Sequence, residues 1–179
     1  RLCSEGEDWN VVFVGEGPRR EALETLAHEL GVRTRVTFAG QVQRGDALWQ
    51  YFDTADCFVL SSRSEGTPKV LLEAMARGLP IIASKVAGVP TSVTHQERGL
   101  LFEDDDLTGL VASLRWLAAD PSLRECVAAN AHHFCIEHTV EKATGRMLDK
   151  VFSCWPHLGG SKKMAPLNAH VQQVNDSAS

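Results

Sequence analysis

Short apolar runs that alternate with helix-like patterns constrain this chain more than any other feature. The runs span residues 10–15, 35–40, 57–60, 80–84 and 99–102. Each run is too continuously apolar for an antiparallel strand with one solvated face. Alternation of such strands with helices predicts an α/β fold, in which right-handed crossover helices cover both faces of a parallel sheet.

Residues typical of helix boundaries separate these runs. Pro18 is expected to open the first helix and Gly31 to end it. Asp46 is expected to cap a short helix that turns Phe52 and Ala55 inward. The next helix is expected to run from Thr67-Pro68 to Gly78, with Val70, Leu71, Ala74 and Met75 facing the core. Further helices are expected over residues 106–118, 121–137 and 139–152.

Composition indicates one folded domain with a short tail. The chain has 179 residues, of which 44% are hydrophobic, and its patterned part ends near residue 152. We therefore expect a domain over residues 1–152 and a poorly structured tail over 153–179. The net charge of −5 argues against a nucleic-acid partner, and no run approaches the ~20 apolar residues of a membrane span. The start, Arg1-Leu2-Cys3, resembles a cut through a longer protein.

The five cysteines are best interpreted as free thiols in a reducing compartment, because no C-x-x-C pair occurs. His132, Cys135 and His138 would fall on neighbouring turns of one helix, within reach of a soft metal. No second ligand pair with zinc spacing accompanies them. We therefore predict no metal site.

Two turns at the carboxyl ends of the predicted strands are candidate ligand sites. Gly15-Glu16-Gly17 does not complete G-x-G-x-x-G, because Arg20 occupies the last position, so a tight strand-to-helix turn explains it better than dinucleotide binding does. At the second turn, the amides of Gly66, Thr67, Lys69 and Val70 are expected at the start of a helix. Unpaired amides and the helix dipole make such a start suitable for a diphosphate.

Two glutamates flank this second turn. Glu65 precedes the helix and Glu73 lies on its second turn, with seven residues between them. Glu65 could accept hydrogen bonds from sugar hydroxyls and Glu73 from ribose hydroxyls. Spacing alone also fits two carboxylates that only cap and solvate a helix start.

The segment Glu65-Gly-Thr-Pro-Lys-Val-Leu-Leu-Glu73 resembles the E-x7-E signature of family-4 (group 1) retaining glycosyltransferases. The resemblance covers about residues 10–152 and continues, in that family's order, through the following segments: Val14–Pro18, Val36–Val42, Ala55–Leu60, Gly88–Pro90 and Gly99–Phe102. It implies the C-terminal, donor-binding half of a GT-B enzyme, a Rossmann-like parallel sheet with helices on both faces.

The resemblance also implies roles for individual residues. Glu65 would contact the donor sugar as the catalytic residue, and Glu73 would bind the ribose. The backbone at Val42 would meet the base, and the turn at Gly15 and Gly17 would belong to the same site. The amides that would hold sugar and phosphate are those of Gly66, Thr67, Lys69 and Val70.

Two departures from the family pattern bear on this interpretation. Pro68 stands where the family often has glycine, so one amide donor is absent. The first strand and helix of the domain, with the Arg and Lys that usually grip the diphosphate, would lie before residue 1. An exposed edge or an apolar face is then expected beside residues 11–15, unless another segment covers it. Lys69 and Lys85 match neither cation and are expected to be ordinary surface lysines.

The resemblance implies a retaining transfer of sugar from a nucleoside-diphosphate sugar to an acceptor, in polysaccharide or glycoconjugate synthesis. No metal or other cofactor is expected. The acceptor, a glycan, lipid or small molecule, would bind a separate N-terminal domain. The expected location is the cytoplasm, including the inner face of the membrane. Two alternatives remain: a non-catalytic sugar-nucleotide-binding module and, less favoured by the Glu65–Glu73 spacing, a GT-B-fold sugar-nucleotide epimerase.

Overall fold

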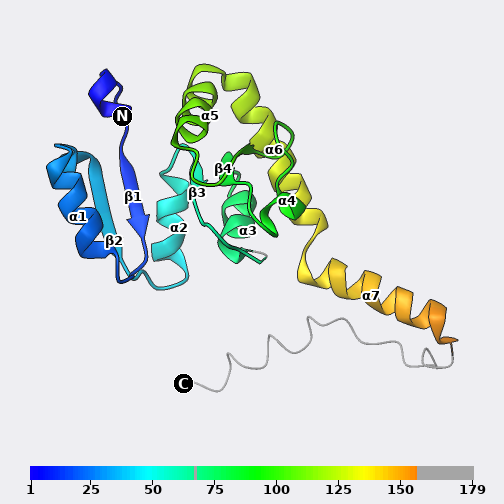
Figure 1. Cartoon of the computed structure of the whole chain (residues 1–179). Helices are drawn as coiled ribbons and strands as arrows, with labels where there is room; N and C mark the ends of the chain where they lie inside the picture. Colours follow the sequence, from blue (N-terminus) through cyan, green and yellow to red (C-terminus); the bar gives the residue numbers. More distant parts are fainter. Residues whose placement is uncertain (67, 157–179) are drawn as a thin grey trace, which may run out of the picture. The chain divides into compact units, whose positions relative to one another are not determined.

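The computed structural model describes residues 1–66 and 68–156 and confirms an α/β fold built on parallel strands (Figure 1). The chain divides into two compact units, Arg1–Ile136 and Glu137–Ser179. The elements of the first unit are η1 (Cys3–Glu5), β1 (Val11–Val14), α1 (Arg20–Glu29), η2 (Arg33–Arg35), β2 (Val36–Gly40), α2 (Asp46–Asp53), β3 (Phe58–Leu60), α3 (Lys69–Ala76), β4 (Ile81–Ser84), α4 (Val89–Ser92), β5 (Leu100–Phe102), α5 (Leu107–Ala119) and α6 (Pro121–Glu137), whose last residue opens the second unit.

The strands form two separate parallel sheets within the first unit. β1 pairs with β2, with Val11 opposite Val36, and Phe13 stacks on Phe38 with ring centroids 5.3 Å apart. The second sheet has the order β3-β4-β5. The sequence predicted parallel strands, and the structure confirms them but divides them between two sheets.

The three-stranded sheet is covered on both faces, because every residue of its central strand is buried. Ile81 and Ala83 of β4 belong to one apolar cluster, which includes Leu71 and Met75 of α3. Ile82, between them in sequence, belongs to a second cluster with residues of β5, α5 and α6. Successive strand residues point to opposite faces, so this alternation places α3 and α5 on opposite sides of the sheet (Figure 1).

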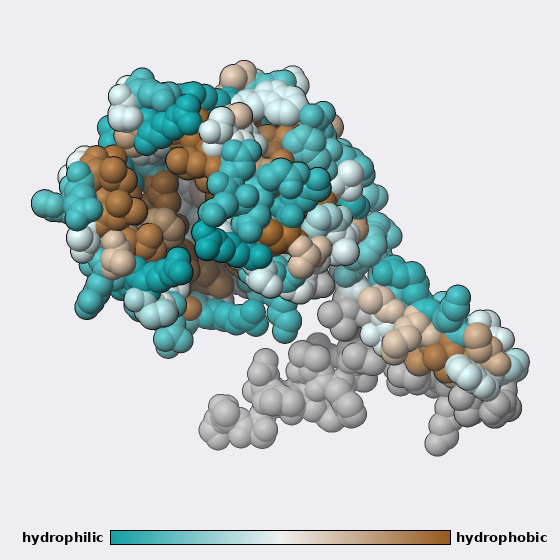
Figure 2. All heavy atoms as spheres, in the orientation of Figure 1, coloured by the Kyte–Doolittle hydropathy of each residue, from teal (hydrophilic) through white to brown (hydrophobic). Residues whose placement is uncertain are grey.

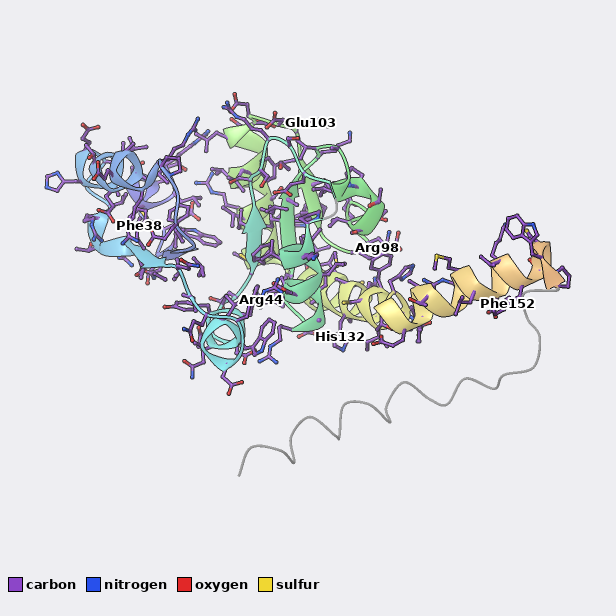
Figure 3. The ribbon with its side chains drawn as sticks, turned by 90° about the horizontal axis from the view of Figure 1, so that it is seen from below. Phe38, Arg44, Arg98, Glu103, His132 and Phe152 are labelled. Atoms are coloured by element: carbon purple, nitrogen blue, oxygen red, sulfur yellow. The ribbon has the colours of Figure 1, made fainter. Side chains whose placement is uncertain are left out.

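Side chains of α6 fix this helix on α3. His132 Nδ1 lies 3.3 Å from the Met75 carbonyl oxygen, and the Cys135 thiol donates to the Leu72 carbonyl at 3.4 Å. His132 is labelled in Figure 3. Among the described residues, no three His, Cys, Asp or Glu side chains gather as metal ligands. The structure thus gives His132 and Cys135 of the predicted His–Cys cluster a packing role between two helices.

The two-stranded sheet differs from the expectation that every apolar run is buried. All four β1 residues are exposed, with relative accessibilities of 43–49%. Figure 2 shows the resulting hydrophobic surface at the left of the molecule, over β1 and its neighbours. This exposure confirms the second form of the expectation, an apolar face beside residues 11–15.

Two details of α2 correct the sequence-based expectations. Asp46 does not cap α2: it is the first helical residue, and Gly45 occupies the N-cap position with a φ of 113°. The Gly45 carbonyl accepts hydrogen bonds from the amides of Leu48 and Trp49, both at 3.0 Å. Ala55 lies beyond the helix and is exposed, whereas Phe52 is buried as predicted. A glycine that directs the chain into the helix therefore replaces the expected side-chain cap.

The second unit contains the helix α7 (Val140–Cys154). The Thr139 side chain accepts a hydrogen bond from the Lys142 amide at 3.3 Å and caps the helix. The expected helix over residues 139–152 is confirmed. The expected tail lies outside the described residues from position 157 onward.

Candidate functional site

The predicted site lies where β3 ends and α3 begins. The loop after β3 leads through Glu65, Gly66 and buried Pro68 to Lys69, the first residue of α3. The first N–H groups of an α-helix have no intrahelical partner, so the amides of Lys69 and Val70 lie at the positive end of α3. Pro68 occupies the N-cap, and its carbonyl accepts the Leu71 amide at 3.1 Å. Thr67 falls outside the described residues.

Two contacts hold this loop in place from β4 and the turn that follows it. The buried hydroxyl of Ser84 donates to the Ser62 carbonyl at 2.5 Å. The Gly88 amide donates to the Glu65 carbonyl at 3.1 Å. A Cβ atom added at Gly88 would overlap the carbonyl of Gly66, so only glycine permits this approach. The loop that carries Glu65 is thus fixed by segments more than twenty residues further along the chain.

The two glutamates of the E-x7-E segment lie in different surroundings. Glu65 is half-buried in the loop, immediately before the start of α3. The Glu73 side chain, on α3, is 22% exposed, and its Oε1 atom accepts a hydrogen bond from Arg44 Nη2 at 3.0 Å. Figure 3 labels Arg44 in the loop between β2 and α2. This ion pair connects the loop that contains Val42 to the helix that carries Glu73.

The turn that contains Gly15 and Gly17 belongs to the two-stranded sheet. The Gly15 amide donates to the Gly40 carbonyl at 2.8 Å, and a φ of 128° at Gly15 requires glycine there. Arg20 closes the turn with an ion pair to Glu16 at 2.8 Å and a hydrogen bond to the Phe38 carbonyl at 3.3 Å. Val42, half-buried, follows Gly40 in the next loop. The contacts described for Gly15 therefore link it to Gly40 at the carboxyl end of β2, and not to α3.

Sequence reasoning missed two arginines in the loops that follow β2 and β3. Arg44 holds Glu73, and Arg63 in the loop before α3 pairs with Asp105 at 2.8 Å. The Asp105 carboxylate raises the pKa of the Arg63 guanidinium, chiefly through this hydrogen bond. Lys85 pairs with Glu103 at 2.9 Å and is half-exposed, as expected for a surface lysine. A survey of basic residues in every carboxyl-end turn would have found both arginines.

Comparison with known proteins decides the family. The model described as "Glycosyl transferases group 1" matches residues 1–134, about three quarters of the chain. The chain belongs to this family. The lipopolysaccharide core biosynthesis glycosyltransferase LpsD of Rhizobium meliloti is 36% identical over 148 residues, which is 80% of this chain and 41% of LpsD.

Solved structures share the fold of this group 1 glycosyltransferase chain. The C-terminal domain of LpcC, a group 1 protein from Francisella tularensis, is 28% identical with a TM-score of 0.66, over 74% of this chain and 70% of that one. Anabaena HepE in complex with UDP-glucose shares the fold, with a TM-score of 0.71 at 22% identity, over 81% of this chain and 41% of HepE. The chain thus spans about two fifths of LpsD and of HepE. Within the described part of the chain, no helix has both the length and the apolarity to cross a membrane.

Proposed function

We propose that this chain is the donor-binding part of a retaining glycosyltransferase that transfers a sugar from a nucleoside-diphosphate sugar to an acceptor. The observation that carries the proposal is the arrangement of Glu65 and Glu73 around the start of α3, at the carboxyl ends of parallel strands. The fold shared with HepE, which was solved with UDP-glucose, supports a nucleotide-sugar donor.

Each part of the proposed site has a chemical task. The amides at Gly66, Thr67, Lys69 and Val70 and the dipole of α3 hold the diphosphate. Glu73 accepts hydrogen bonds from the ribose hydroxyls, and the Val42 backbone meets the base. Gly15 and Gly17 keep the turn between β1 and α1 compact enough for a ligand to approach. Glu65 faces the donor sugar.

The proposed catalysis rests on electrostatics and positioning. Negative charge grows on the diphosphate as it leaves, at the positive end of α3. Positive charge grows on the anomeric carbon, where the Glu65 carboxylate stabilises it. The incoming nucleophile and the leaving group share one face of the sugar, so the anomeric configuration is retained. These tasks require no metal ion.

The acceptor belongs to the part of the protein that this chain does not contain. LpsD acts in lipopolysaccharide core biosynthesis by its name, which supports an acceptor in glycoconjugate synthesis. We infer a cytoplasmic enzyme that reaches such acceptors at the inner face of the membrane through peripheral contact.

Isothermal titration of the chain with UDP, GDP, ADP and CDP tests the donor-binding role. We expect weak binding of at least one of them, because no residue here matches the family's Arg and Lys on the diphosphate. Each charge-assisted contact contributes about 1.5–3 kcal/mol, so two such contacts correspond to roughly two to four decades in Kd. Glu73→Gln should weaken this binding further.

Inorganic pyrophosphate is the control ligand, since it lacks the ribose that Glu73 is proposed to bind. Its affinity should be unchanged in Glu73→Gln. Absence of binding to all four nucleotides would contradict the proposal, and nanomolar affinity would show that the unmatched cations are unimportant. In the complete protein, released nucleoside diphosphate indicates a transferase, an epimerised donor indicates an epimerase, and binding without turnover indicates a non-catalytic module.

A further inference from the structure

Arg44 contacts the proposed site through the carboxylate of Glu73. Its guanidinium Nη2 lies 3.0 Å from Glu73 Oε1, although 28 residues separate the two in sequence. Arg44 itself is 73% exposed, whereas Glu73 is 22% exposed. The arginine therefore extends from the β2–α2 loop to reach a carboxylate that is already largely shielded.

This contact uses one oxygen of Glu73 and leaves the other available. A glutamate side chain on a helix surface has three rotatable bonds and samples several rotamers when nothing holds it. A hydrogen bond from a charged donor at 3.0 Å selects one of them. Oε2 can then accept from a further donor without reorientation of the carboxylate.

We propose that Arg44 is a positioning residue for Glu73: it orients the Glu73 carboxylate toward the ribose hydroxyls of a bound nucleotide. This inference rests on the proposed function, because it assigns the ribose to Glu73. It adds that recognition of the ribose depends on the β2–α2 loop as well as on α3. The loop that carries Val42 for the base thus also supports the ribose contact.

The ratio of two dissociation constants tests this role. Each of UDP, GDP, ADP and CDP that binds is compared with its 2′,3′-dideoxy counterpart, which lacks the hydroxyls that Glu73 would bind. We expect the native chain to prefer the ribose form by about tenfold or more, as for a hydrogen bond to a charged group. Arg44→Gln should reduce this preference about two- to fivefold, the contribution typical of an exposed ion pair. Arg44→Lys keeps the charge and should restore part of the preference.

Arg35→Gln is the matched control, because it removes the same charge from an arginine that pairs with Asp8 and not with Glu73. It should leave the preference unchanged. In a Glu73→Gln background, Arg44→Gln should have no further effect on the preference, since the group that it orients is gone. Circular dichroism checks that each variant is folded.

The outcomes separate this inference from the proposed function. An unchanged preference in Arg44→Gln overturns the positioning role while donor binding stands. A reduction that persists in the Glu73→Gln background also overturns it, because Arg44 would then contact the ligand directly. Failure of the native chain to bind any of the four nucleotides, or to distinguish the ribose, contradicts the proposed function and the inference together.

Discussion

At the scale of single residues, Glu65 and Glu73 differ in what each would contact during the reaction. Glu73 meets the ribose, which does not change between bound donor and transition state. Its loss therefore weakens binding of the donor and of the transition state by the same amount. Glu73→Gln should raise KM while kcat changes little. The measurement is steady-state kinetics of the complete protein that contains this domain.

Glu65 lies nearer the sugar, where positive charge develops as the diphosphate leaves. Glu65→Gln should therefore depress kcat. One lost charge-assisted contact of ~2–3 kcal/mol corresponds to roughly 30- to 150-fold in rate. If both glutamates only cap and solvate the start of α3, both substitutions should lower the melting temperature and leave the kinetics nearly unchanged. That pattern would remove both residues from the site.

Sequence could place the two glutamates at a helix start, because spacing is a local feature, but their roles in a donor site come from the family resemblance and stay a prediction. Arg44 could be found as a basic residue of a carboxyl-end turn, but its pairing with Glu73 could not, because the two lie 29 positions apart on different elements. Sequence periodicity predicts which face of a helix is buried, but not which loop side chain reaches across to it. The positions of residues on one continuous segment could therefore be predicted, whereas the contacts between loops and helices could not.

At the scale of elements, the same distinction holds for the strands and helices. The bounds of β4 and α3 follow from a continuous apolar run and an amphipathic pattern, and both were predicted to within about two residues at each end. The N-cap of α2 was not predicted correctly, because Asp46 and Gly45 are both compatible with a helix start. The short helix α4 also escaped prediction, since Gly88-Val-Pro90 reads as a turn.

The contact between the β3–α3 loop and the turn before α4 gives a test at this scale. Gly88→Ala places a methyl group against the Gly66 carbonyl, and the two segments must separate. Overpacking of this kind costs about 1–3 kcal/mol, which lowers the melting temperature by roughly 3–10 °C for a chain of this size. Thermal unfolding monitored by circular dichroism measures the change.

Gly66→Ala is the control for this substitution, on the other side of the same contact. A Cβ atom at Gly66 meets nothing within 4 Å, so its melting temperature should stay close to the native value. Equal effects of the two substitutions would show that the approach of Gly88 to Gly66 does not support the loop.

At the scale of the whole molecule, the exposure of β1 is the feature with the largest physical consequence. Parallel strands are normally buried on both faces, yet every side chain of β1 is 43–49% exposed. The sequence predicted an exposed edge or an apolar face here. It could not show that the strands separate into two sheets, because pairing depends on which strands meet after the chain has folded.

An exposed apolar strand edge favours pairing with another copy of the chain. We therefore expect self-association at high concentration, visible by sedimentation velocity. Val12→Lys should weaken it, because Val12 is the most exposed residue of β1 and a charge at a strand edge opposes edge-to-edge pairing. Burial of one valine contributes about 1.5–3 kcal/mol, so the dissociation constant of the dimer should rise by roughly tenfold or more.

Leu107→Lys is the matched control: Leu107 is 60% exposed, but it lies on α5 and presents no strand edge. An equal effect of both substitutions would assign the association to general surface hydrophobicity. A monomer at all concentrations would show that β1 does not mediate self-association.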